Sequence, residues 1–254
     1  MTNPTIELIH RHGSVRAYKP DPVPTALIET IVVAGQRAPT SSNLQMYSVV
    51  LVTDPEDRRR MRAYCGGHPH ISQAPVFLTW CADLSRLDRI CKSRAIPHQS
   101  GYVENFLLAV VDAVIAAQNA GLAAESLGLG FCYIGAIRNN PREVIQLLEL
   151  PHLVFPVVGM TVGWPAKPPR IRPRLPLAAV LHKDRYSFEN EAAYLEEYDQ
   201  EMIATGIYSG RQKGPHDPVP ESEYSWQEHS AREVSKIVRP HLRAVLQEIG
   251  FGLK

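Results

Sequence analysis

Two separated cationic segments carry the clearest indication of chemistry in this chain. The first, His10-Arg-His-Gly-Ser-Val-Arg16, combines guanidinium groups, a hydroxyl group and an accessible glycine amide. The second, Arg170-Ile-Arg-Pro-Arg174, lies in a stretch without Asp or Glu, and extended backbone would project Arg172 and Arg174 to the same side. Guanidinium groups bind phosphate through paired hydrogen bonds, so either segment could hold a phosphate dianion. A solvated basic turn is the alternative for each segment.

Two further loops contain groups suited to a flat polar ligand. The loop Pro39-Thr-Ser-Ser-Asn-Leu-Gln45 has no base nearby in sequence, so its hydroxyl and amide groups fit hydrogen bonds to a heteroaromatic ring better than nucleophilic attack. Tyr133-Ile-Gly-Ala136 follows a predicted strand, and Gly135 would let a flat ligand approach the backbone closely. A plain turn at the end of the strand explains Gly135 equally well.

Motifs for several other reactions are absent from the sequence. Gly128-Leu-Gly130 lacks the spacing of a dinucleotide-binding loop, and no P-loop, nucleophile elbow or zinc-protease motif occurs. Cys65, His68 and His70 lie close together, but without a second cluster they favour a polar loop over a metal site. A hydrolase or phosphotransferase would need an activated nucleophile or a metal, and the sequence identifies neither.

The elements that must position these residues alternate along the first two thirds of the chain. Apolar periodicity predicts helices at 5–18 (short, running into a loop), 26–37, 103–127, 141–150, 189–203 and 226–249. β-rich runs predict strands at 47–53, 76–82, 131–134 and 155–162. The first two strands are predicted to be buried on both faces. The helix at 103–127 is apolar almost all round, so it should run through the core. The fold class is therefore α+β or α/β, with a helical extension.

Composition limits the classes of function. The chain has 254 residues and a net charge of +1, which leaves no basic footprint for non-specific nucleic-acid binding. The longest apolar run, Phe106 to Ala117, contains Asp112 and falls short of the roughly 20 residues that span a bilayer. With no signal peptide and four isolated cysteines, we expect a cytoplasmic protein with reduced thiols and no membrane partner.

The chain resembles the FMN-dependent nitroreductase superfamily, in particular its branch of oxygen-insensitive NADPH nitroreductases and NADPH–flavin oxidoreductases. The matching stretches follow the family order: His12–Arg16, Arg37–Gln45, Asp112–Asn119, Ala124–Gly130, Tyr133–Asn140, Gly163–Pro165, Arg172–Pro176 and Arg239–Pro240. The resemblance implies an α+β fold, with a mixed sheet flanked by helices, in an intertwined homodimer. It also implies an FMN-binding core at 1–185, with a helical extension and pocket loop at 186–254 belonging to the same domain.

The resemblance assigns places around FMN to individual residues. His12, Ser14, Arg172 and Arg174 would hold the phosphate, and Arg16 would lie near the N1–C2=O edge of the ring. Thr40, Ser41 and Asn43 would come from the partner chain, Gly135 and Ala136 would face N5, and His68 would replace an amide that contacts the flavin. The complete implied set is His12, Gly13, Ser14, Val15, Arg16, Thr40, Ser41, Asn43, His68, Tyr133, Ile134, Gly135, Ala136, Arg172, Pro173 and Arg174.

The implied activity is a ping-pong oxidoreduction. NADPH or NADH would deliver hydride to FMN and leave, and a nitroaromatic, a quinone or free flavin would then take two electrons at the same site. Because the cofactor carries the redox chemistry, no side chain is predicted to be catalytic. A non-catalytic or weakly active flavin-binding protein of the same fold is the alternative.

Two departures from the family pattern bear on the co-substrate. Gly13 stands where the branch usually has Arg, and the loop arginine associated with the NADPH 2′-phosphate aligns near Ser209, with Arg211 and Lys213 close by. The preference between NADPH and NADH therefore stays open, and the insertion at 213–224 predicts a different loop at the pocket mouth. Asn43, Arg211 and Arg239 are predicted to line the pocket for the nicotinamide or acceptor, although a surface helix cation is the alternative for Arg239.

Overall fold

The computed structural model describes residues 2–211 and 217–254, which divide into two units. Unit 1 comprises Met1–Ile171 and Arg239–Lys254, and unit 2 comprises Arg172–Val238. The predicted division into a core at 1–185 and an extension at 186–254 stays a prediction about domain organisation.

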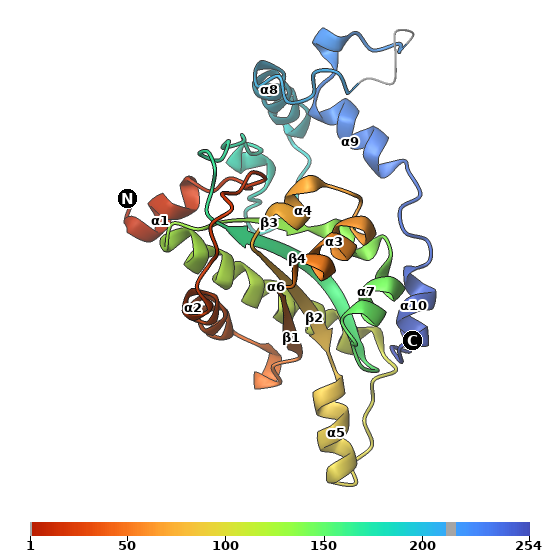
Figure 1. Ribbon diagram of the computed structural model, residues 1–254. Coiled ribbons are helices and arrows are strands. Elements are labelled where there is room, and N and C mark those ends of the chain that lie inside the picture. Colours follow the sequence, from red (N-terminus) through yellow and green to blue (C-terminus); the bar gives the residue numbers. More distant parts are fainter. Residues whose placement is uncertain (1, 212–216) are drawn as a thin grey trace. The chain divides into compact units, whose positions relative to one another are not determined.

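A sheet lies at the centre of unit 1 (Figure 1). Its strands are β1 (Tyr47–Val52), β2 (Val76–Asp83), β3 (Gly130–Ile134) and β4 (Val154–Gly163), in the order β1-β2-β4-β3. Tyr47 pairs with Ala82, Val76 with Val162 and Gly130 with Gly163. Each of these pairings is antiparallel among the described residues, so the expectation of a mixed sheet is wrong for the strands of this chain. The reason is that each strand enters the sheet at the end where its neighbour in the sheet leaves it, so the two run in opposite directions.

Helices cover both faces of this sheet. Unit 1 contains α1 (Pro4–His10), α2 (Thr25–Gln36), α3 (Pro55–Tyr64), α4 (Pro69–Gln73), α5 (Ser85–Ser93), α6 (Val103–Ser126), α7 (Pro141–Leu147) and α10 (Leu242–Glu248). Leu78 of β2 packs in one core with Ala116 of α6 and Ile28 of α2. Its neighbour Phe77 packs in another core with Met61 of α3. Successive strand residues point to opposite faces, so α2 and α6 cover one face and α3 covers the other.

The central and edge strands differ in burial. Every residue of β2 is buried, as predicted. β1 was also predicted to be buried on both faces, but this is wrong: most of its residues are half-buried and Leu51 is 42% exposed. The cause is its place at the edge of the sheet, where it has one neighbour instead of two.

Helix α6 matches its predicted bounds but not its predicted burial. The residues that it buries against the rest of unit 1 are small, and they include Ala109, Ala113, Ala116, Ala117, Ala120, Gly121 and Ala124. Larger apolar side chains point outward, with Leu107 54%, Val111 43% and Val114 41% exposed. The small residues let α6 approach α2 and the sheet closely, which leaves the larger ones uncovered within one chain.

The length and composition of α6 also correct an expectation about the membrane. Its 24 residues, with a mean hydropathy of 1.7 over the most apolar window, are enough to cross a bilayer by those two measures. By length and composition alone, the presence of Asp112 therefore does not exclude that α6 crosses a membrane. We nevertheless assign α6 to the core, because it packs against α2 and against the sheet and because core helices commonly pass the same test.

Unit 2 is mainly helical, with α8 (Glu191–Ala204), α9 (Trp226–Val234) and the short turns η3 (Leu177–Ala179) and η4 (Glu221–Glu223). Asp199 of α8 is buried and accepts hydrogen bonds from the backbone amide and the side-chain amide of Gln227, at 3.0 and 2.8 Å. The predicted helix at 226–249 is wrong as a single helix, because it is two: α9 and α10. Pro240 lacks the amide that a continuous helix needs, and Arg239 has a φ of 52°.

Candidate functional site

The segment His12–Arg16 is held in place like an additional strand. The amide of Val15 donates to the carbonyl of Phe131 at 2.9 Å, and the hydroxyl of Tyr18 donates to the carbonyl of Val15 at 2.8 Å. Val15 is buried, whereas Arg16 is exposed. The backbone of this segment is therefore fixed by the sheet, and its polar side chains are left for other contacts.

His12 is fixed by a carboxylate of α6. Its Nδ1 lies 2.7 Å from Oε1 of Glu125, whose side chain is only 11% exposed, and its ring lies 5.1 Å from that of Phe131. Glu125 also contributes to raising the pKa of the Tyr133 hydroxyl, although burial is the larger cause. A histidine oriented through Nδ1 in this way presents Nε2 to a ligand. Sequence reasoning missed Glu125, although it lies in a stretch that matched the family.

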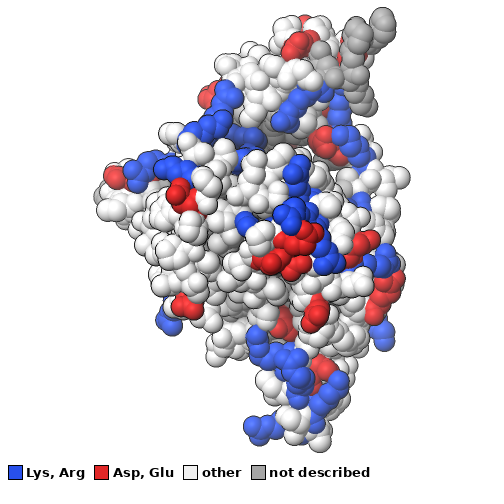
Figure 2. All heavy atoms as spheres, viewed as in Figure 1, with Lys and Arg blue, Asp and Glu red and all other residues white. Residues whose placement is uncertain are grey.

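Arg16 is a cation without a counter-charge in the described part of the chain. Its charge, with that of His68, lowers the pKa of His70, for which burial is the main cause. The rings of His68 and His70 stack at 5.7 Å, so the structure brings the predicted residues Arg16 and His68 into one neighbourhood. On α3, by contrast, cations lie beside acids: Figure 2 shows red among the blue there, and Arg59 pairs with Glu56.

Gly13 is a departure from the family pattern that the structure explains. A Cβ atom at this position would lie 2.8 Å from Cβ of Pro169 and 2.9 Å from the carbonyl oxygen of Arg170. Real Cβ contacts are not that short, so any side chain would push the segment Pro169–Arg170 away. The missing family arginine therefore follows from how closely these two segments pack.

The loop from Thr40 to Met46 has an unusual backbone. It contains the short helix η1 (Ser41–Asn43), and three of its non-glycine residues have left-handed φ angles: Ser42 at 48°, Asn43 at 58° and Gln45 at 52°. Of the predicted residues here, Thr40 and Ser41 are half-buried and Asn43 is exposed. A cavity of about 590 Å³ opens beside Asn43, between α2, β1 and α5. Its lining, among the described residues, includes none from the segment His12–Arg16.

Two side chains distant in sequence hold this loop. The carboxylate of Asp112 accepts hydrogen bonds from the amides of Ser41 and Met46, both at 3.0 Å. On the other side, Nη1 of Arg86 donates to the carbonyl of Gln45 at 2.9 Å. Neither role was predicted. The sequence did contain one indication, because Asp112 is an acidic residue inside an otherwise apolar helical pattern.

At the end of β3 a side chain at the predicted Gly135 would meet no clash. The nearest atom that a Cβ at this position would meet is Nη2 of Arg138, at 3.5 Å. Arg138 donates to the carbonyl of Val157 at 2.5 Å, and Arg239 donates from Nε to Oδ1 of Asn139 at 2.8 Å. Burial and the charge of Arg239 lower the pKa of Arg138. The predicted Arg239 thus belongs to a pair of cations that, within the described ranges, has no acidic partner; sequence reasoning missed Arg138.

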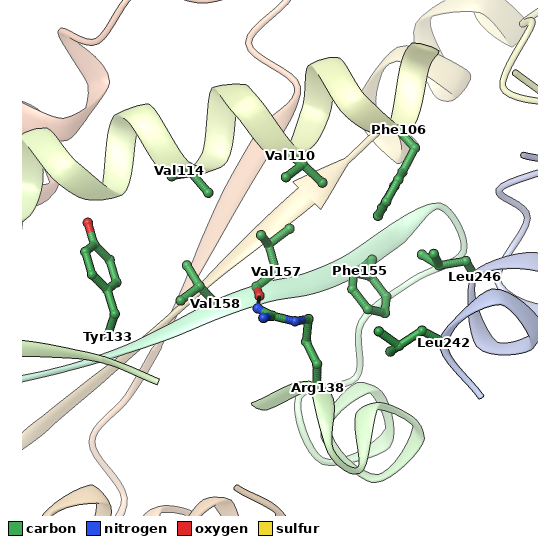
Figure 3. A pocket seen from close by; sticks show the side chains of 10 residues that line it. All are labelled: Phe106, Val110, Val114, Tyr133, Arg138, Phe155, Val157, Val158, Leu242 and Leu246. Carbon is green, nitrogen blue, oxygen red and sulfur yellow. Dashed lines mark hydrogen bonds between the residues drawn. The ribbon is translucent and has the colours of Figure 1, made fainter. Parts of the chain in front are cut away.

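Arg138 also borders an apolar cavity of about 460 Å³, which the sequence did not predict (Figure 3). Side chains of α6 point into it from one side, and those of β4 and α10 point into it from the other. The lining residues are Phe106, Val110, Val114, Tyr133, Arg138, Phe155, Val157, Val158, Leu242 and Leu246. The outward-facing stripe of α6 continues from Val114, so cavity and stripe form one apolar surface.

Within unit 2, the predicted residues Arg172 and Arg174 both lie near Tyr198. Nη1 of Arg174 donates to the carbonyls of Arg172 and Pro173 at 3.1 Å each, and the hydroxyl of Tyr198 donates to the carbonyl of Pro173 at 3.3 Å. Burial raises the pKa of Tyr198, while the charges of Arg174 and Arg172 lower it. The extended segment is thus anchored to α8 through its backbone.

Arg211 takes part in a stacked cluster in the same unit. Its guanidinium carbon lies 5.4 Å from the ring centre of Tyr208, and that ring stacks on His229 at 4.6 Å. Burial, and then the charge of Arg211, lowers the pKa of His229. The other cation named for this loop, Lys213, lies outside the described residues, as does the first part of the insertion at 213–224.

The three residues considered for a metal do not converge. Cys65 is buried in the core beside Met61, and burial raises the pKa of its thiol to about 12. Within the ranges that the structure describes, no group of three or more His, Cys, Asp or Glu side chains is arranged to hold a metal ion.

Comparison with known proteins agrees with this architecture. The model of the Nitroreductase family matches residues 9–164, and that of the Nitroreductase family, C-terminal domain, matches residues 172–254. An oxygen-insensitive NADPH nitroreductase from Salmonella typhimurium is 37% identical over 252 residues, covering 99% of this chain and 100% of that protein. An FMN reductase [NAD(P)H] from Bacillus subtilis is 37% identical over 256 residues, covering 99% of both. The structure of an NADPH:FMN oxidoreductase from Vibrio harveyi complexed with NAD+ superposes with a TM-score of 0.87 at 33% identity, covering 99% of this chain and 100% of that one.

Proposed function

This chain belongs to the nitroreductase family, and from that premise we propose that it is an FMN-dependent NAD(P)H oxidoreductase. The observation that carries the proposal is Arg16, an exposed guanidinium on a segment fixed by the sheet, with no acidic partner among the described residues. A fixed, unneutralised cation is suited to an anionic ligand, and reduced flavin carries its negative charge at the N1–C2=O edge.

The residues present fit FMN. Gly135 has no Cβ to hold a flat ring away from its backbone, and only the flexible end of Arg138 lies at that position, so N5 of the ring would lie near Gly135 and Ala136 at the end of β3, after Tyr133 and Ile134. His12, oriented by Glu125, and Ser14 would hold the phosphate together with Arg172 and Arg174. Arg16 would stabilise negative charge on the ring, with His68 beside it. When bound, FMN supplies the capacity to accept a hydride and pass it on.

We propose that the active form is a homodimer. The outward stripe of Leu107, Val111 and Val114 and the cavity next to it give α6 an apolar surface of the kind that a second copy covers. In that arrangement Thr40, Ser41 and Asn43 complete the partner's flavin site. The cavity beside Asn43 has no residue of His12–Arg16 in its lining, among the described residues, and this supports the assignment.

The nicotinamide co-substrate and the acceptor would use one pocket in turn, because both must stack on the same face of the flavin at about 3–3.5 Å. Asn43, Arg211 and Arg239 are the residues proposed to line it. The cation pair Arg138–Arg239 supports binding of an anionic group such as a nicotinamide phosphate. We propose nitroaromatics, quinones and free flavin as acceptors, either NADPH or NADH as donor, and the cytoplasm as the location.

The direct test is the colour of the purified protein. We expect flavin absorbance bands, bleaching by NADPH or NADH without oxygen, and recolouring by a nitroaromatic or a quinone. A protein that is yellow but is not bleached by either nicotinamide would be the non-catalytic flavin-binding alternative. A protein that stays colourless after incubation with FMN would contradict the proposal. Light scattering tests the dimer independently, since a monomer in the presence of FMN would remove the partner's loop from the site.

A further inference from the structure

The loop Thr40–Met46 cannot owe its shape to its own sequence. Left-handed backbone is unfavourable for a non-glycine L-residue, and the loop contains three such residues, Ser42, Asn43 and Gln45. Asn tolerates this conformation better than Ser or Gln, so two of the three are unfavourable. Contacts from outside the loop must therefore compensate.

Asp112 supplies those contacts from the interior of α6. It is 1% exposed, and its two oxygens each accept one backbone amide, from Ser41 and Met46, at 3.0 Å. These bonds bracket the left-handed residues from both ends. Hydrogen bonds to a charged group are stronger than neutral ones, so two of them can offset the cost of the backbone that they hold.

The burial of this carboxylate is itself informative. Among the described residues no Lys or Arg pairs with Asp112, and its immediate helix neighbours Ala109, Ala113 and Ala116 are apolar. A buried charge without a paired cation is costly unless hydrogen bonds satisfy it. In a helix whose other inward positions are almost all small apolar residues, an alanine would pack without that cost.

We propose that Asp112 is a positioning residue for the flavin site: it sets the shape of the loop that presents Thr40, Ser41 and Asn43 to FMN. This inference rests on the proposed function for the identity of the ligand, but not for the shape of the loop. Arg86 is a second holder of the same loop, through the carbonyls of Gln45 and Tyr47 at 2.9 and 3.3 Å. Asp112 holds donors from inside and Arg86 holds acceptors from outside.

The test is Asp112→Asn, which keeps the size of the side chain but turns one acceptor oxygen into a donor facing an amide. We expect amide exchange at Ser41 and Met46 to accelerate by about tenfold or more, which is the loss of about 1.4 kcal/mol of protection. The dissociation constant of FMN should rise by a similar factor, while circular dichroism remains that of a folded protein. Unchanged exchange at both amides, or an unchanged FMN affinity in a variant that exchanges faster, would overturn the proposal.

The matched control is Asp54→Asn. Asp54 also accepts two backbone amides, those of Glu56 and Asp57 at 2.8 and 3.0 Å, but it does so at the start of α3. We expect it to lower stability without changing FMN affinity or the exchange of Ser41 and Met46. An equal loss of FMN affinity in both variants would mean that Asp112 acts only through general stability.

A second variant decides the matter if Asp112→Asn does not fold. Arg86→Ala removes a side chain that is 45% exposed, so the core of α6 is left intact. It should accelerate exchange in the loop and weaken FMN binding in the same direction but by less, about threefold. No change in either measurement would contradict the inference. If the unaltered protein binds no FMN, the proposed function fails, whereas the amide exchange still reports whether Asp112 shapes the loop.

Discussion

Two segments of the proposed flavin site are held by the same helix in different ways. In the segment His12–Arg16 the sheet fixes the backbone, and a carboxylate of α6, Glu125, contacts only the side chain of His12. In the loop Thr40–Met46 a strand holds only the last residue, since the amide of Asp83 of β2 donates to the carbonyl of Met46 at 2.9 Å, and another carboxylate of α6, Asp112, binds the backbone amides of Ser41 and Met46 directly. The sheet sets the backbone of His12–Arg16, and α6 only orients the side chain of His12. In the loop Thr40–Met46, α6 holds the backbone itself.

This difference determines what a substitution can do in each segment. A polar side chain of His12–Arg16 can be removed without disturbing the backbone, so binding should change while the fold is unaffected. In the loop, removing a distant side chain should change the backbone itself. Variants of Arg16 and Gly13 test the first half of this contrast, and variants of Asp112 and Arg86 test the second.

The largest effect is expected for Arg16→Gln. The variant loses a charge-assisted hydrogen bond to the cofactor, about 1.5–3 kcal/mol, which corresponds to roughly a 10- to 100-fold weaker binding of FMN. The free energy of unfolding of the FMN-free protein should change by less than about 0.5 kcal/mol, as for other surface substitutions. Titration of FMN fluorescence and urea denaturation measure the two quantities.

The matched control for Arg16 is Arg59→Gln on α3, an exposed arginine that already pairs with Glu56. We expect no change in FMN affinity from it. If Arg16→Gln bound FMN as tightly as the unaltered protein, Arg16 would not face the cofactor. If it lost stability as well, the side chain would contribute to the fold, and the contrast between the two segments would fail.

Next in size is the effect of adding a side chain at Gly13. Gly13→Ala and Gly13→Arg both place a Cβ 2.8 Å from Pro169 and 2.9 Å from the carbonyl of Arg170. Overpacking of this kind costs about 1–3 kcal/mol, or a fall in Tm of several degrees for a chain of this size. Restoring the family arginine should therefore destabilise the protein rather than tighten FMN binding. Calorimetry without FMN measures the loss.

The control for Gly13 is Gly101→Ala, where a Cβ would meet nothing within 4 Å. Its Tm should stay within about a degree, since surface substitutions usually have small effects. If Gly13→Arg were as stable as the unaltered protein and bound FMN more tightly, Pro169–Arg170 would yield easily. The packing of Pro169–Arg170 against His12–Arg16 would then be less rigid than the hydrogen bond from Val15 to Phe131 indicates.

The parts of the fold that depend on local patterns were predictable, and those that depend on neighbours were not. Periodicity identified β2 and the bounds of α6 because alternation and helical spacing are local properties. It could not identify β1 as an edge strand, because strand order depends on pairing between distant segments. The burial of α6 failed for a related reason, since an apolar residue looks the same in sequence whether its own chain or another copy covers it.

The site divides in the same way. Arg16, His68 and Arg239 were predicted from the resemblance, and their roles at the flavin site stay predictions; the structure places Arg16 and His68 near His70, and Arg239 near Arg138. The side chains that hold the site, Asp112 and Arg86, were not predicted, because their partners lie far away in sequence: Asp112 contacts Ser41, 71 positions distant. A motif identifies residues that face a ligand more readily than residues that hold them in place.

A smaller effect is expected for Glu125→Gln. The amide keeps the shape of the side chain but loses its charge, so His12 loses a charge-assisted partner, worth about 1 kcal/mol or a roughly fivefold weaker binding of FMN. Riboflavin lacks the phosphate that His12 is proposed to hold, so its affinity should not change. Titrations with both flavins measure the difference. Equal losses for the two would place His12 away from the phosphate.

The smallest effect concerns His70, the buried neighbour of Arg16. Its lowered pKa means that the unfolded chain takes up a proton at about pH 6.5, whereas the folded protein does not until a lower pH. The unfolded state therefore binds more protons in this window, and the free energy of unfolding falls as the pH falls below about 6.5. His70→Gln removes this pH-dependent contribution. Between pH 7 and the pKa of His70 in the folded protein, the free energy of unfolding of the variant should therefore decline less steeply than that of the unaltered protein.

Urea denaturation across that pH range measures the slope. Arg16 links this prediction to the contrast between the segments, because its charge contributes to lowering the pKa of His70. The double variant Arg16→Gln/His70→Gln should therefore match His70→Gln alone in its pH dependence, while Arg16→Gln alone should fall between it and the unaltered protein. Identical slopes for Arg16→Gln and the unaltered protein would mean that the guanidinium does not act on His70. Burial and the charge of His68 would then account for its lowered pKa.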